Sequence, residues 1–170
     1  YNEFINQLQG EAGIFNTSAT QSVQQHYAFF KSSNSITASS LIQGLITDRK
    51  TYAQYSINTI RDANITAQLF GDIFSSNTPY FITIEDYFIF SSTIASLEYL
   101  IDNYTSNNTL ANNQHFNNYG SYLSSKSNLF FYINPGKTVV ALKDKLQTNY
   151  GKDLNFSLDS LEKFTAFSVQ

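Results

Sequence analysis

The chain repeats one arrangement of apolar and polar positions three times: an aromatic run, a short polar break and a segment with helical spacing. The aromatic runs lie at 27–30, 87–90 and 130–133, and the helical segments that follow them at 36–46, 94–101 and 139–146. In the first two copies the break contains two serines, and an Ala-Ser pair follows in the helical segment. Because each strand and each helix has an apolar face to bury, the pattern predicts a layer of strands covered by helices.

Shorter signals predict the elements at the start of the chain. A helical face that includes Phe4 and Leu8 is expected to stop at Gly10, because glycine commonly ends helices. Apolar residues then alternate or cluster over 11–16 and 25–33, a pattern typical of two paired strands.

The middle of the chain predicts a helix, a strand and a helical turn in that order. The helix covers 35–47 and opens with Ser35 as its cap. Period-two spacing predicts a strand over 51–61. A helical turn is expected between 62 and 78, interrupted near Gly71.

The second half begins with a hairpin over 81–90 that turns at Glu85-Asp86. This pair lacks the glycine that a two-residue turn prefers, so the turn type stays open. The helix of the second copy extends over 93–104. The spacing then predicts a helix over 112–123, a short helix that includes Leu154 and Leu161, and a terminal strand over 164–169.

Together these elements predict the α+β class, with a mostly antiparallel sheet, helices packed on one face and duplicated strand–strand–helix units as one way to build it. A chain of 170 residues suits one compact domain that buries roughly 70% of its unfolded surface. We therefore expect a single domain over 1–170. It contains 15 Phe and 12 Tyr, which supply most of the core.

Charge and composition exclude some partners and restrict others. Charged residues are only 14% of the chain, against about 25% in typical domains. Nucleic acid is not expected as a partner, because phosphate binding needs clustered Lys and Arg. The chain has no cysteine, so disulfides and thiolate metal sites are excluded. It also has no apolar run of about 18 residues, so no transmembrane helix is predicted.

Two segments resemble ligand-binding loops without completing their patterns. Asn134 to Thr138 follows a strand and opens a helix, but a phosphate-binding loop would need glycine where Phe131 stands. Asp153 to Asp159 has the alternating oxygen spacing of a calcium loop, yet Leu158 and Phe164 occupy the positions of its glycine and its glutamate. Neither segment predicts a cofactor or a metal.

The remaining polar candidates have ordinary structural explanations. His26 and His115 each lack a second ligand at metal spacing, and no Gly-x-Ser-x-Gly elbow marks a serine nucleophile. No catalytic, cofactor-binding or metal-binding residue is therefore predicted. Asn-x-Ser/Thr sequons are expected by chance in so Asn-rich a chain; they begin at Asn16, Asn64, Asn103, Asn107 and Asn155.

Exposed tyrosines and paired acids leave two alternatives open. Six tyrosines could form a stacking platform for sugar or peptide, or could be packing residues with polar tips: Tyr52, Tyr55, Tyr99, Tyr104, Tyr119 and Tyr122. A glycan hydrolase would need two opposed carboxylates, and the candidates for them are Glu11, Asp72, Glu85 and Asp86. Glu98 and Asp102 form a further acidic pair on one helix face.

Several of these runs resemble an uncharacterised domain of unknown function found in large exported proteins of the bacterial envelope. The resemblance covers nearly the whole chain; its main segments are 11–14, 81–90, 97–102, 109–116 and 127–135. It implies an extracytoplasmic location, in the periplasm, on an outer-membrane lipoprotein or secreted, with further β-rich segments in the same protein. It transfers no catalytic residue. The ragged start at Tyr1 and the strand-like end fit the expectation of a fragment of a longer exported protein.

Three function hypotheses follow. The first is a non-catalytic extracytoplasmic module for binding or structural assembly, with envelope protein or glycan as its partner. The second is an envelope glycan hydrolase that uses a carboxylate pair. The third is a fragment whose partner is the rest of its own chain.

Overall fold

The computed structural model describes residues 2–20, 23–74, 77–120, 131–134 and 167–169. The chain divides into two compact units, one formed by 1–19 and 25–103 and the other by 20–24 and 104–170. The single domain expected over residues 1–170 stays a prediction.

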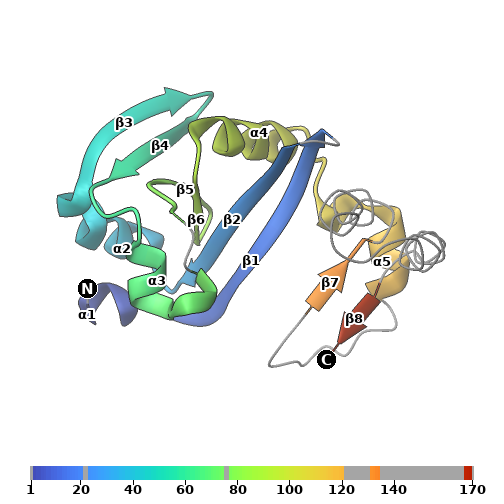
Figure 1. Ribbon diagram of the computed structural model, residues 1–170, viewed down its shortest axis with the longest axis horizontal. Coiled ribbons are helices and arrows are strands. Elements are labelled where there is room, and N and C mark those ends of the chain that lie inside the picture. Colours follow the sequence, from blue (N-terminus) through green and yellow to red (C-terminus); the bar gives the residue numbers. More distant parts are fainter. Residues whose placement is uncertain (1, 21–22, 75–76, 121–130, 135–166, 170) are drawn as a thin grey trace, which may run out of the picture. The chain divides into compact units, whose positions relative to one another are not determined.

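The first unit is built around a six-stranded sheet with strand order β1-β2-β6-β5-β4-β3 (Figure 1). Its strands are β1 (Leu8–Thr20), β2 (Val23–Ser32), β3 (Ile46–Tyr52), β4 (Tyr55–Ile60), β5 (Tyr80–Ile84) and β6 (Tyr87–Ser91). Its helices are α1 (Asn2–Ile5), α2 (Ser35–Ile42), the 3₁₀ turn η1 (Gln43–Leu45), α3 (Ile65–Phe70), the 3₁₀ turn η2 (Asp72–Phe74) and α4 (Ile94–Thr105).

Three hairpins, each followed by a helix, make up this unit. In chain order they are β1-β2 with α2, β3-β4 with α3 and β5-β6 with α4. The sheet order places the last hairpin between the other two, and the pairs β2–β6, β3–β4, β4–β5 and β5–β6 are antiparallel. The α+β class with a mostly antiparallel sheet is thus confirmed, and the strand–strand–helix unit occurs three times.

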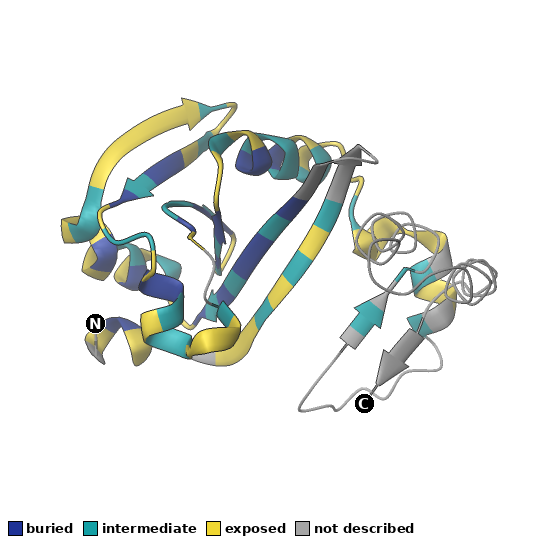
Figure 2. Ribbon diagram, viewed as in Figure 1, coloured by how far each residue is buried: buried dark blue, intermediate teal, exposed yellow. Residues whose placement is uncertain are grey.

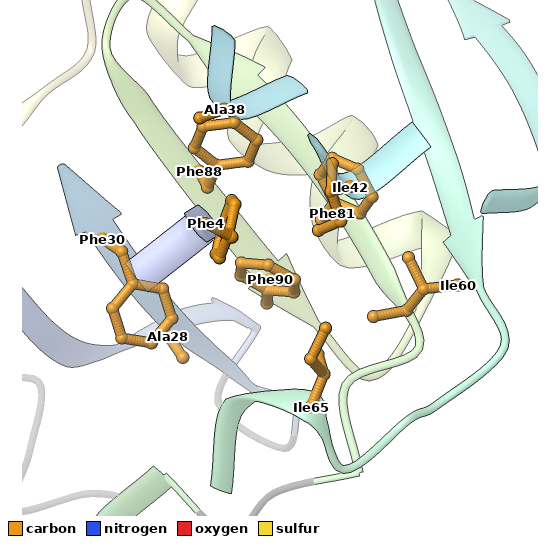
Figure 3. Packing of buried hydrophobic residues seen from close by; sticks show 10 residues of the cluster. All are labelled: Phe4, Ala28, Phe30, Ala38, Ile42, Ile60, Ile65, Phe81, Phe88 and Phe90. Carbon is orange, nitrogen blue, oxygen red and sulfur yellow. The ribbon is translucent and has the colours of Figure 1, made fainter. Parts of the chain in front are cut away.

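One face of the sheet is closed by α1, α2 and α3 over an aromatic core. Figure 3 shows its ten buried residues, which come from four strands and three helices: Phe4, Ala28, Phe30, Ala38, Ile42, Ile60, Ile65, Phe81, Phe88 and Phe90. Ala28 and Phe30 alternate along β2 and pair with Phe90 and Phe88 of β6, so all four side chains share this face. The predicted one-sided packing of helices holds for α1 to α3.

The fourth helix lies on the opposite face. Tyr27, whose side chain points away from that of Ala28, donates its hydroxyl proton to the carbonyl oxygen of Ser96 in α4 at 2.8 Å. Leu97 and Ile101 of α4 are completely buried. Lys50 of β3 contacts Glu98 of α4 at 2.6 Å. The sheet therefore has helices on both faces. Figure 2 shows buried residues, in dark blue, both on strands of the sheet and on its helices.

Two predicted boundaries were wrong near the start of the chain. Leu8 belongs to β1 rather than to a helix, and Gly10 lies inside β1 at φ 71°. Leu8 still packs against the core, which explains why its spacing from Phe4 fitted a helical face. The cap of α2 is Asn34, whose Oδ1 accepts from the Thr37 amide at 3.0 Å, so Ser35 is the first helical residue.

The helix predicted over 35–47 ends earlier, and the strand predicted over 51–61 contains a turn. α2 stops at Ile42, η1 follows, and β3 already begins at Ile46. Gly44 weakens the helical stretch, and β-branched Ile46 and Thr47 favour a strand. The β3–β4 turn falls at Ala53-Gln54, inside the predicted strand.

Predictions for the next segments are confirmed. α3 ends at Phe70 with Gly71 as its C-cap, and η2 follows, as expected for the interrupted helical turn. Glu85 and Asp86 form the two-residue turn between β5 and β6, with Glu85 at φ 51°. The helix expected over 93–104 is α4.

The second unit contains the 3₁₀ turn η3 (Leu110–Asn112), α5 (Gln114–Gly120), β7 (Phe131–Ile133) and β8 (Phe167–Val169). β7 and β8 pair antiparallel, and Phe116 of α5 packs edge-on against Tyr132 of β7 at 5.0 Å between ring centroids. The predicted strand at 130–133 and the terminal strand over 164–169 are thus confirmed over 131–133 and 167–169, and their other residues lie outside the described residues. The helices predicted over 139–146 and around 154–161 lie outside the described residues.

Candidate functional site

Three half-buried aromatic rings from neighbouring strands form a row on the face of the sheet that carries α4. They are Phe15 of β1, Phe29 of β2 and Tyr87 of β6, and we call this row the aromatic strip. The ring centroids of Phe15 and Phe29 are 6.1 Å apart, and those of Phe29 and Tyr87 are 6.0 Å apart. The strip is therefore continuous across three strands.

A glycine makes room for the middle ring. A Cβ atom at Gly13 would lie 2.6 Å from Cε1 of Phe29, so the ring rests where a side chain of β1 would otherwise stand. Gly13 lies on the same face as Phe15, two residues away in the strand. The position of Phe29 in the strip thus depends on the absence of a side chain at Gly13.

Buried Tyr27 anchors the end of the strip that is nearest to α4. Its ring stacks on Phe15 with centroids 4.6 Å apart and planes inclined by 13°. Its hydroxyl lies 3.0 Å from Oε1 of Gln25, which also accepts from Thr17 at 2.9 Å. Burial raises the pKa of Tyr27 to about 12, so this phenol stays protonated at neutral pH.

An ion pair closes the other end of the strip. Lys31 Nζ lies 2.9 Å from one carboxylate oxygen of Glu11, and the Tyr87 hydroxyl donates to the other at 2.9 Å. Lys31 Nζ also lies 5.6 Å from the centroid of the Tyr87 ring, within the range of a cation–π contact.

These contacts shift the titration of all three groups. The hydrogen bonds from Lys31 and then Tyr87 lower the pKa of Glu11 below its ordinary value of 4.5. The hydrogen bond to Glu11 raises the pKa of Lys31, and burial followed by the bond to Glu11 raises the pKa of Tyr87. The strip thus ends in a neutralised pair of opposite charges.

A second polar cluster joins β3 to α4. Glu98 pairs with Lys50, and the carboxylate oxygens of Asp102 each lie 3.1 Å from the Tyr52 hydroxyl. That hydrogen bond raises the pKa of Tyr52. Glu98 and Asp102 therefore bind different residues of β3, and both contacts hold α4 against this edge strand.

The four acids considered for a hydrolase lie on three separate elements. Glu11 lies on β1 at one end of the aromatic strip, Asp72 on η2, and Glu85 with Asp86 in the β5–β6 turn. An open hollow of about 460 Å³ lies over η1 and β3, and none of the four lines it; its residues are Gln43, Ile46, Thr47, Asp48 and Arg49. The lowered pKa of Glu11 is opposite to the shift that a general acid requires.

The histidines and other candidates are dispersed. His26 Nδ1 lies 2.6 Å from Oδ1 of Asn16, and His115 belongs to α5. Within the described ranges, no three His, Asp or Glu side chains are grouped so that they could hold a metal ion. Asn134 is described, whereas the rest of its loop and the calcium-like segment at 153–159 lie outside the described residues.

The six tyrosines considered either as a platform or as packing residues come from several elements. Tyr52 and Tyr55 flank the β3–β4 turn, Tyr99 and Tyr104 lie on α4, and Tyr119 lies on α5. Tyr122 lies outside the described residues. The aromatic strip uses other residues, which the sequence reasoning missed because they meet only through the register of three strands. One sequence feature could have indicated the strip: Gly13 stands two residues before Phe15 in an alternating strand, and it leaves space on that face for another ring.

No family model, curated protein or solved structure matches this chain. None of the helices in the described part of the chain is long and apolar enough to cross a membrane.

Proposed function

We propose that this chain is a non-catalytic binding or structural module of an exported bacterial envelope protein, and that the aromatic strip is its contact surface for envelope glycan. The observation that carries the proposal is the continuous row of three half-buried rings across β1, β2 and β6. The location outside the cytoplasm rests on the resemblance described above, and the cysteine-free composition is compatible with it.

The chemistry of the strip suits a sugar chain. Aromatic rings offer a flat apolar face, and the apolar face of a pyranose packs on such a surface while its hydroxyls remain available. Glu11 and Lys31 at the end of the strip supply an acceptor and a donor for those hydroxyls. Since the two charges neutralise each other, the site favours an uncharged polar ligand over a polyanion.

Co-sedimentation with insoluble bacterial cell-wall glycan tests the proposal. We expect the wild-type chain to sediment with the glycan, and Phe29→Ala and Tyr87→Ala each to weaken binding about threefold to tenfold through the loss of one ring contact. Tyr55→Ala is the matched control, because Tyr55 is half-buried on β4 and lies outside the strip.

Two results would contradict the proposal. If the wild-type chain does not bind the glycan, the partner is a different molecule. If the chain releases soluble sugar and Glu11→Gln or Glu85→Gln abolishes that release, the chain is a hydrolase and the strip serves a substrate.

A further inference from the structure

The two outer strands of the sheet differ in how they are protected from further strands. An unpaired strand edge exposes backbone N–H and C=O groups that can bond another strand, and natural proteins often block such edges with charges or bulges. β3 carries Asp48, Arg49 and Lys50 in succession and has a register shift between Ile46 and Asp48. β1 is longer, at 13 residues, and Glu11 is its single charged residue.

The register between β1 and β2 follows from their side-chain contacts. Glu11 meets Lys31, Phe15 stacks on Tyr27, and Thr17 bonds Gln25. These contacts fit one antiparallel register. The contacts of Gly13 with Phe29 and of Asn16 with His26 fit the same register.

The backbone hydrogen bonds of the sheet can then be assigned outward from the β5–β6 turn. A two-residue turn makes Ile84 and Tyr87 a pair that exchanges both backbone bonds. Bonding alternates from there, so Phe88 and Phe90 bond β2. The bond from the Ser32 amide to the Asp86 carbonyl oxygen at 2.7 Å agrees with this assignment.

The same alternation reaches β1. Ala28 and Phe30 bond β6, so Tyr27 and Phe29 bond β1. Phe15 and Gly13 are their partners. Consequently the amide and carbonyl groups of Ala12, Ile14 and Asn16 face outward along the edge, away from β2.

Among the described residues, no strand pairs with β1 along this edge from Ala12 to Asn16. All three outward-bonding residues are exposed, and Ile14 exposes 40% of its surface. The carboxylate of Glu11, the one charged residue of β1, is bound by Lys31 and Tyr87 at the end of the aromatic strip, so it does not block strand pairing at the edge.

We propose that the β1 edge pairs antiparallel with the β1 edge of a second copy of this chain, related by a two-fold axis. This inference goes beyond the proposed function and does not depend on it. Self-pairing centred on Ile14 sets Ile14 opposite Ile14 of the second copy and Ala12 opposite its Asn16. Glu11 then faces Thr17 of the second copy, so no like charges oppose each other and two β-branched residues meet at the centre.

Charge placed at the centre of the pairing tests this arrangement. Molar mass is measured by light scattering and sedimentation velocity over a range of protein concentrations. We expect the wild-type chain to dimerise, and Ile14→Lys and Ile14→Glu each to weaken the dimer about tenfold or more by placing like charges opposite each other. Ile36→Lys is the matched control, because Ile36 is 83% exposed on α2, and it should dimerise as the wild type does.

Mixing the two variants makes the test specific for the two-fold register. An equimolar mixture of Ile14→Lys and Ile14→Glu should recover the dimer, because Lys then lies opposite Glu. A wild-type chain that stays monomeric, variants that dimerise as tightly as the wild type, or a mixture that stays monomeric would each overturn the proposal. Circular dichroism of each variant confirms that the sheet is intact.

Discussion

The two faces of the sheet use similar aromatic residues with different results. On the face covered by α1 to α3, Phe81, Phe88 and Phe90 are at most 2% exposed. On the other face α4 buries Tyr27, whereas Phe29 and Tyr87 stay half-buried. The strands alternate in the same way on both faces, so the difference comes from how much of each face a helix covers. What separates a core ring from a candidate contact ring is thus the position of the covering helix.

The largest expected effect is on the free energy of unfolding, and it appears when one ring from each face is replaced by alanine. Phe88→Ala should lower the free energy of unfolding by about 3–5 kcal/mol, because removal of this fully buried ring leaves a cavity in the core. Phe29→Ala should cost less than half as much, since its ring is already partly hydrated. Urea denaturation of the two variants gives both values. Equal losses of unfolding free energy would contradict this comparison and would show that both rings are equally buried.

A smaller loss of stability is expected from filling the space beside the Phe29 ring. Gly13→Ala should destabilise the protein by about 1–3 kcal/mol, because the new methyl group forces the Phe29 ring to move. Gly44→Ala is the control: nothing lies within 4 Å of its added Cβ, and alanine favours the helical turn in which Gly44 lies. Thermal unfolding should therefore show a loss for the first variant and none for the second. If Gly13→Ala unfolds at the same temperature as the wild type, the Phe29 ring can adopt another position without loss of stability.

The smallest effect is the pH dependence of the ion pair at the end of the strip. The pKa of Glu11 is lower in the folded chain than its ordinary value of 4.5, so the folded state favours the ionised form. Its contribution is complete above that ordinary value and is lost as the pH falls through the lowered pKa. The melting temperature of wild type should therefore exceed that of Glu11→Gln slightly at pH 7, and the two should converge toward pH 3. A difference that does not change with pH would contradict this origin.

Local pattern was enough to predict some elements and not others. The β5–β6 hairpin was predictable because two apolar halves flank Glu85-Asp86, and contacts within such a hairpin are local. The run from Tyr27 to Phe30 is apolar at every position, because one of its faces packs in the core and the other carries buried Tyr27 and half-buried Phe29. That run marked a strand without showing which side chains belong to which face.

The candidate site depended on contacts between distant segments. Tyr87 reaches Glu11 across two strand pairings, and these pairings follow from the sheet order rather than from any spacing in the sequence. Lys50 likewise meets Glu98 because α4 crosses to the edge strand. Leu8 shows the opposite error, since its spacing from Phe4 imitates a helix although it reaches the core from a strand.

The position of the last hairpin constrains how the first unit assembles. β5 and β6 are the last strands of this sheet in chain order, yet they occupy its centre, between β2 and β4. Until residues 80–91 are available, the first two hairpins cannot join, and β2 and β4 each present a bare inner side to other chains. When the chain is synthesised from its N-terminus, this sheet is thus completed in a single late step. The chain is most prone to aggregation just before that step.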